Sequence, residues 1–155
     1  MLVVSYVWGH KKYHTKAKKW QQNLRKVKTK SHLETKNWKK SYQEAINYKP
    51  TFILDMLKKF NQGVVYSDID LKFFSKPKLF ENKENVDVIL INWNFDPRVS
   101  EGCFDPYVLE TSGFLMYFNN TPNAKKLLRL WSKELKGKEH LADDRVLATT
   151  FAKYN

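Results

Sequence analysis

Residues 49–70 read KPTFILDMLKKFNQGVVYSDID, a helical pattern followed directly by a short apolar run. Pro50 suits the first turn of a helix, and Asn61 and Gly63 provide a stop signal after its apolar stripe. Residues 64–70 are predicted to form a buried strand that ends in two carboxylates. A helix that leads into a buried strand is typical of α/β folds.

The two carboxylates, Asp68 and Asp70, are one residue apart. On a strand, residues i and i+2 point to the same side, so the pair is expected to converge while Ile69 returns to the core. Close carboxylates repel each other, whereas Mg²⁺ or Mn²⁺ keeps both ionised and also binds substrate phosphates. The alternative is that the two aspartates only form a turn after the strand. We predict a metal site at the carboxyl edge of a sheet, where α/β folds bind ligands.

The remaining elements are predicted from apolar periodicity and capping signals. The continuous apolar run of residues 86–93 predicts a strand buried on both faces. Thr121 and Pro122 are the expected cap and first residue of a late helix. Residues 29–35 show little periodicity, and residues 94–105 read as a loop. Further strands are expected at residues 1–7 and 114–118, and further helices at residues 13–27, 37–47 and from about 142.

These elements predict an α/β fold over one domain, residues 1–155. The sheet is expected to be mixed and mostly parallel, with helices on its faces. Within this domain, residues 11–49 are expected to form a basic helical segment of less regular pattern.

Basic residues are concentrated at the start of the chain. The formal net charge is +12, and the first 50 residues hold thirteen Lys and Arg against Glu34 and Glu44. Interleaved aromatic side chains would allow contact with a polyanion through phosphate charge and base stacking. Because the lysines are dispersed and Arg25 is the one arginine there, a solvated face is the favoured interpretation and nucleic acid is not the expected partner. Attraction of an anionic substrate or membrane surface is a third interpretation.

The sequence carries no signal for export or membrane insertion. Its one cysteine, Cys103, excludes an intramolecular disulfide framework. Residues 1–8 are apolar, but they lack a basic leader and are too short to cross a membrane. We therefore expect a cytoplasmic protein without a transmembrane segment, of bacterial or viral origin.

A series of short motifs over residues 38–155 resembles the nucleotide-diphospho-sugar transferases, glycosyltransferases of the GT-A fold with a D-x-D motif. No single motif is specific, but their order and spacing are considerably more so. The resemblance implies one GT-A-like, Rossmann-like domain. The motifs are Lys49 before Phe52-Ile53-Leu54, the strand Val-Val-Tyr-x-Asp-x-Asp, Pro77, Ser112-Gly113-Phe114, a capped helix with Leu127, Leu128 and Trp131, and the pair Asp143-Asp144.

The resemblance implies a metal-dependent glycosyltransferase that moves a hexose from a nucleoside-diphosphate sugar, with UDP favoured, to a hydroxyl of a glycan or protein. Retention of anomeric configuration is favoured. A bound Mn²⁺ or Mg²⁺ would neutralise charge on the leaving diphosphate. The implied metal ligands are Asp68 and Asp70, the implied catalytic residues are Asp144 and Asp143, and the implied nucleotide-sugar-binding residues are Tyr6, Lys49, Tyr66, Asp68, Ser112 and Gly113.

Two features depart from this family, and two other classes stay open. Arg145 stands where the family usually has Gln, and a frequent C-terminal His or Asp metal ligand has no counterpart here. One alternative is a basic module that binds nucleic acid through residues 11–49. The other is a haloacid-dehalogenase-type phosphatase, in which the first Asp of a D-x-D motif is a nucleophile. That class places the motif on its first strand, whereas here helices precede it.

Overall fold

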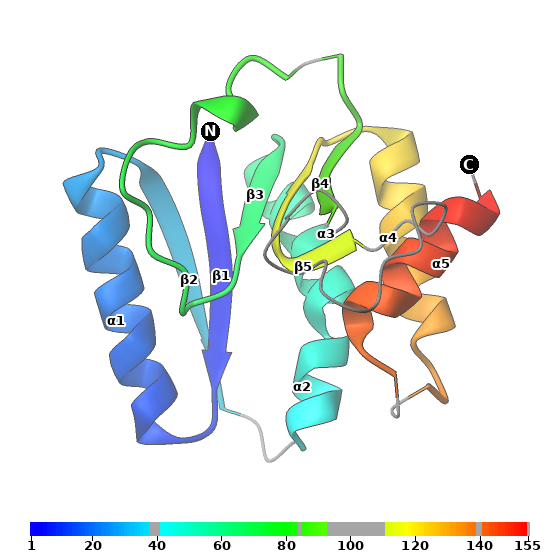
Figure 1. Cartoon of the computed structure of the whole chain (residues 1–155), viewed down its shortest axis with the longest axis horizontal. Coiled ribbons are helices and arrows are strands. Elements are labelled where there is room, and N and C mark those ends of the chain that lie inside the picture. Colours follow the sequence, from blue (N-terminus) through cyan, green and yellow to red (C-terminus); the bar gives the residue numbers. More distant parts are fainter. Residues whose placement is uncertain (38–40, 84, 93–110, 139–140, 155) are drawn as a thin grey trace, which may run out of the picture.

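The computed structural model describes residues 1–37, 41–83, 85–92, 111–138 and 141–154 (Figure 1). The expected loop at residues 94–105 and Cys103 lie outside these ranges. The elements are, in chain order, β1 (Leu2–Trp8), α1 (Lys11–Lys26), β2 (Lys30–Lys36), α2 (Tyr42–Asn47), α3 (Lys49–Phe60), β3 (Val64–Ser67), the short 3₁₀ helix η1 (Lys78–Phe80), β4 (Val88–Asn92), β5 (Thr111–Phe118), α4 (Pro122–Glu134) and α5 (Asp143–Tyr154).

The strands form one mixed sheet in the order β2-β1-β3-β5-β4. β1 pairs in parallel with β2 and with β3, whereas β5 is antiparallel to both β3 and β4. Four strands therefore run in one direction and β5 runs in the other. This confirms an α/β fold with a mixed sheet in which most strands share one direction.

Helices cover both faces of the sheet (Figure 1). On one face, Trp20 and Leu24 of α1 pack with Phe73 and Phe80 of the segment after β3. On the other face, α3, α4 and α5 contribute the larger apolar cluster. Val3 belongs to the first cluster and its neighbour on β1 to the second, as the alternation of a strand requires. The central strands are thus buried on both faces.

Local signals in the sequence account for several boundaries. Thr121 caps α4 by accepting a hydrogen bond from the Ala124 amide at 3.3 Å, and Pro122 begins the helix, as predicted. α3 begins at Lys49 and ends before Asn61, whose φ of 48° is the left-handed conformation common after a helix. The predicted step from helix to strand is therefore confirmed.

Three sequence-based expectations are corrected by the structure. Residues 30–36 form the edge strand β2, which was missed because an edge strand with polar neighbours shows no apolar run. β4 is only partly buried throughout, because it is the opposite edge strand and not an interior one. The helical prediction for residues 11–49 holds for α1 and α2 but not for β2 between them.

Candidate functional site

Four separate segments bring polar groups to one edge of the sheet. β1 and β3 end at this edge, β5 begins there, and α3 and α5 start beside it. Lys49 comes from the first residue of α3, Asp68 from the position after β3, Gly113 from β5 and Asp143 from the first residue of α5. The carboxyl edge is where open α/β sheets bind ligands.

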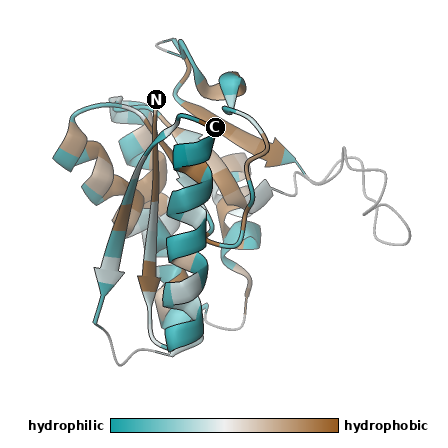
Figure 2. Cartoon of the chain, turned by 90° about the vertical axis from the view of Figure 1, so that its left-hand side faces the viewer, coloured by the Kyte–Doolittle hydropathy of each residue, from teal (hydrophilic) through white to brown (hydrophobic). Residues whose placement is uncertain are grey.

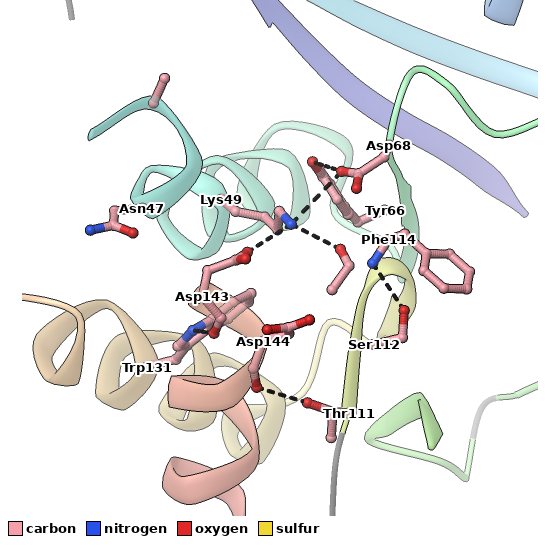
Figure 3. Close-up of polar contacts among 12 residues, drawn as sticks. Asn47, Lys49, Tyr66, Asp68, Thr111, Ser112, Phe114, Trp131, Asp143 and Asp144 are labelled. Carbon is pink, nitrogen blue, oxygen red and sulfur yellow. Dashed lines mark hydrogen bonds and ion pairs between the residues drawn. The ribbon is translucent and has the colours of Figure 1, made fainter. Parts of the chain in front are cut away.

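Lys49 stands at the centre of this group (Figure 3). Its Nζ lies 2.7 Å from Asp143 Oδ2 and 3.7 Å from Asp68 Oδ1, and it donates a hydrogen bond to the Gly113 carbonyl at 2.9 Å. The side chain is only 6% exposed. A buried ammonium needs such partners, because removing it from water is costly. Lys49 therefore joins three distant parts of the chain.

Electrostatics keeps this lysine charged. Burial alone would lower the pKa of Lys49, but Asp143 and Asp68 outweigh it and hold the pKa above its ordinary value. Burial raises the pKa of Asp68, against the opposing effect of Lys49. Within the described residues, the site thus contains one strongly held cation beside a carboxylate whose pKa lies above its ordinary value.

Asp68 and Asp70 do not share a strand. β3 ends at Ser67, and the next residues form a turn in which the Leu71 amide donates to the Asp68 carbonyl at 3.3 Å. Asp68 faces inward and accepts a hydrogen bond from the Tyr66 hydroxyl at 2.7 Å, whereas Asp70 is 61% exposed and lies 3.6 Å from Lys16. The expected strand through residue 70 was wrong: a turn follows Ser67, so the alternation of a strand does not set the direction of Asp70.

Gly113 permits the close approach of Lys49. A Cβ on Gly113 would lie 3.1 Å from Lys49 Nζ and 3.3 Å from the Asp144 Cβ. The resemblance implied that Gly113 binds the nucleotide sugar, and in this structure the nearest groups are a lysine and an aspartate. Ser112 is fully buried, and its hydroxyl accepts a hydrogen bond from the Phe114 amide at 3.3 Å. Ser112 thus shapes the strand next to the site.

The pair at the start of α5 has two different environments. Trp131 of α4 donates to the Asp143 carbonyl at 2.9 Å, which holds that residue against Lys49. Thr111 donates to the Asp144 carbonyl at 3.1 Å, and the Asp144 carboxylate accepts from the Arg145 amide at 2.8 Å. Burial, together with the charge of Asp143, raises the pKa of Asp144. Asp143 is therefore the ion-paired member, and Asp144 is a carboxylate whose pKa lies above its ordinary value.

A cleft of about 200 Å³ lies beside these charges. Its lining includes Lys49, Asp68, Asp70 and Asp143 together with aromatic side chains. Tyr6 is one of them, but its hydroxyl donates to the Ala45 carbonyl at 2.7 Å, so the ring is a structural wall. The lining also includes Trp8, Tyr13 and Tyr42, which the sequence interpretation did not assign to the nucleotide-sugar site.

These aromatic rings form a connected group at the end of β1. Trp8 stacks against Tyr6 with ring centroids 5.7 Å apart and against Tyr13 at 6.1 Å. Tyr42, at the start of α2, is tilted against Trp8 at 6.3 Å and is 64% exposed. The sequence signal for this group was Trp8, the aromatic residue that ends the apolar strand directly before Gly9. Rings of this kind present a stacking surface to a planar ligand.

The donor groups suit a divalent cation that is shared with a substrate. In the described part of the chain, no group of three or more His, Cys, Asp or Glu side chains is placed to hold a metal ion. Mg²⁺, however, commonly uses one or two carboxylates together with substrate phosphates and water. The two contacts of the Asp68 carboxylate with described residues fall on Oδ1, and Asp70 is largely exposed. Asp68 and Asp70 are therefore the residues that could hold an ion together with a substrate phosphate and water.

No protein-family model matches the chain, and no curated protein matches its sequence. In the described ranges, no helix combines the length and the apolar character needed to cross a bilayer. The functional assignment consequently rests on the geometry of the site.

Proposed function

We propose that this protein is a metal-dependent glycosyltransferase with a GT-A-like domain. It transfers a hexose from a nucleoside-diphosphate sugar, UDP being favoured, to a hydroxyl group of a glycan or protein. The observation that supports this best is the group formed by Lys49, Asp68 and Asp143 beside an aromatic-walled cleft at the carboxyl edge. The carboxylates outnumber Lys49, so a bound cation would supply the positive charge that a diphosphate needs, and the aromatic wall offers a nucleobase a flat apolar surface.

The cleft offers one region for each part of such a donor. The base would stack near Trp8 and Tyr42, whose rings line the cleft. The diphosphate would lie toward Lys49, Asp68 and the more exposed Asp70. Mn²⁺ or Mg²⁺, held by Asp68 and Asp70, would supply Lewis-acid stabilisation of the leaving diphosphate.

The transfer forms a bond between the acceptor oxygen and the anomeric carbon and breaks the bond from that carbon to the diphosphate. The hydroxyl proton must leave at the same time or afterwards. Asp144 is the proposed acceptor of this proton, because burial and Asp143 raise its pKa above that of an ordinary carboxyl group. Asp143 is less suited, since it already pairs with Lys49 at 2.7 Å.

Two features disfavour the alternative classes. The D-x-D aspartates follow β3, the third strand in the chain, and not the first strand as in haloacid-dehalogenase-type phosphatases. The basic residues of α1 carry no direct evidence for base recognition, because arginine is rare among them. Hydrolysis of a simple phosphomonoester without any nucleotide would instead indicate the phosphatase class.

The test is calorimetry of the full chain with UDP and GDP, with and without Mn²⁺. We expect UDP to bind only when Mn²⁺ is present and Asp70→Asn to weaken this binding by about tenfold or more. Asp70 is exposed, so the substitution should leave the fold unchanged. Glu81→Gln is a matched control, because it removes a carboxylate that also pairs with a lysine but does not line the cleft.

Release of UDP from a panel of UDP-sugars tests the reaction itself. Asp144→Asn is expected to lower turnover while UDP binding stays close to that of the parent. Nucleotide binding that ignores Mn²⁺ and tolerates Asp70→Asn equally well would contradict the proposed function.

A further inference from the structure

The face of the molecule that α1 shares with the segment after β3 has an unusual composition. Lys16, Lys19 and Lys26 of α1 line a cleft of about 560 Å³ together with Lys72 and the side chain of Asp70. Beyond it, Phe74 is 86% exposed and Leu79 is 60% exposed. We call the group Lys16, Lys19, Lys26, Lys72, Phe74, Lys78 and Leu79 the basic-apolar face.

The two parts of this face are fixed relative to each other. The Asn23 side-chain amide donates to the Phe73 carbonyl at 2.8 Å, and its oxygen accepts from the Phe73 amide at 2.7 Å. Phe73 and Phe80 are buried against Trp20. Figure 2 shows α1 in the foreground with this segment running beside it to η1. Phe74 and Leu79 are thus exposed on a firmly attached segment.

The lysines of this face are short of acidic partners. Lys16 pairs with Asp70 at 3.6 Å, but Lys19, Lys26 and Lys78 form no ion pair with any described residue. Lys72 has its Nζ 5.0 Å from the centre of the Phe74 ring. Nearby Lys76 is excluded from the group because it pairs with Glu81. The face therefore carries several uncompensated positive charges around two apolar side chains.

We propose that the basic-apolar face docks on an anionic phospholipid bilayer. Lysine side chains reach the lipid phosphates, and Phe74 and Leu79 enter the boundary between headgroups and acyl chains. Nucleic acid fits less well, since an aliphatic side chain such as Leu79 offers no stacking and arginine is missing from the group. The basic cleft adjoins the donor cleft at Asp70, which lines both, but the inference does not depend on catalysis.

Co-sedimentation of the full chain with vesicles tests the proposal without any nucleotide. The probes are vesicles of phosphatidylcholine alone and of phosphatidylcholine with about one-third phosphatidylserine, at about 0.1 M salt. We expect binding to the anionic vesicles only, with affinity falling as salt rises. Retention of the protein by neither vesicle would overturn the proposal.

Two double variants separate the apolar and electrostatic contributions. Phe74→Ser with Leu79→Ser should weaken vesicle binding by about tenfold or more, because the variant loses the apolar area that both side chains bury at the boundary between headgroups and acyl chains. Lys19→Glu with Lys72→Glu should weaken it by at least about fivefold for each lysine. All four positions are exposed, so circular dichroism should confirm an unchanged fold.

The matched control is Lys133→Glu with Lys136→Glu, which makes the same charge change at exposed positions at the end of α4 and just after it. It should retain most of the vesicle binding. An equal loss of vesicle binding in this control would show that binding depends on net charge alone. That result would overturn the assignment of the face. Equally tight binding to duplex DNA that tolerates Phe74→Ser with Leu79→Ser would instead identify a nucleic-acid surface.

Discussion

Lys49 Nζ and Asp143 Oδ2 lie 2.7 Å apart, although the two residues begin helices α3 and α5 at distant points in the chain. Both side chains are largely buried. The pair connects the helical layer on one face of the sheet to the carboxyl edge, so the geometry of the site depends on the packing of the whole domain.

Lys49→Met should strongly destabilise the protein. The change leaves Asp143 and Asp68 near each other without their shared cation, and breaking a buried ion pair in this way costs about 3–5 kcal/mol. Urea unfolding would measure the loss. Lys58→Met, at an exposed position on the same helix, should change the free energy of unfolding by less than about 0.5 kcal/mol. Similar stability of both variants would show that the ion pair is unimportant for folding.

Glu34→Gln should have a pH-dependent effect on stability. Burial opposes ionisation of Glu34, but Lys36 and Lys59 lower its pKa from 4.5 to about 2. A depressed carboxyl pKa adds stability above the unfolded pKa, and this stability disappears as pH falls through the folded pKa. We expect a loss of about 1–2 kcal/mol near pH 7, after allowing for solvent screening.

The difference between parent and Glu34→Gln should shrink as pH is lowered from about 4.5 toward 2. Urea titrations at several pH values would follow it. A constant difference over that range would exclude the contribution of ionised Glu34 beside Lys36, whose Nζ lies 2.7 Å from its carboxylate.

Gly113→Ala should disturb the centre of the site. The added Cβ would lie 3.1 Å from Lys49 Nζ, which is held by three partners and cannot move freely. We expect a loss of about 1–3 kcal/mol, in the range of overpacked interiors. Thermal unfolding would measure the change, and recovery of stability in Gly113→Ala with Lys49→Met, relative to the sum of the single changes, would identify Lys49 as the obstructed group.

Trp131→Phe should loosen the start of α5. The indole Nε1 donates to the Asp143 carbonyl at 2.9 Å within the core, and a phenyl ring cannot replace that bond. The lost hydrogen bond and the lost ring volume should cost about 2–3 kcal/mol together. Hydrogen exchange at the first amides of α5 should be faster in the variant than in the parent. Exchange at the amides of α1 should change less. Equal protection in parent and variant would argue against this anchoring role.

Tyr42→Ala should weaken UDP binding without loss of stability, because the ring is exposed at the cleft. Base stacking of this kind contributes about 1–3 kcal/mol, which corresponds to about fivefold or more in affinity. Tyr154→Ala, at another exposed tyrosine on α5, is the control for calorimetry. Unchanged UDP affinity in Tyr42→Ala would remove this ring from the proposed donor site.

The sequence was a good guide where local chemistry sets the structure. Thr121, Pro122 and the helix-to-strand step at residues 49–67 were predictable because caps, turns and apolar periodicity act over a few residues. β2 was not predictable in this way, since an edge strand needs little apolar surface and its pairing with β1 is a long-range property.

The site shows the same division. The types of residue at the site could be predicted from the sequence, but the residues that each side chain contacts could not. Lys49 was expected near phosphates, and its contact with Asp143 depends on how α4 and α5 pack against α3. Asp70 was expected beside Asp68, but a turn changed its direction and gave it Lys16 as a neighbour. Spacing in sequence cannot fix contacts that tertiary packing decides.

The ion pair between Lys49 and Asp143 also orders events during synthesis. A growing chain presents β1, α1, β2, α3 and β3 well before α5, and long-range contacts form slowly because a large loop must close first. Until α5 has been made, Lys49 lacks its nearest carboxylate. We therefore expect the charged centre of the nascent protein to assemble only after α5 has docked.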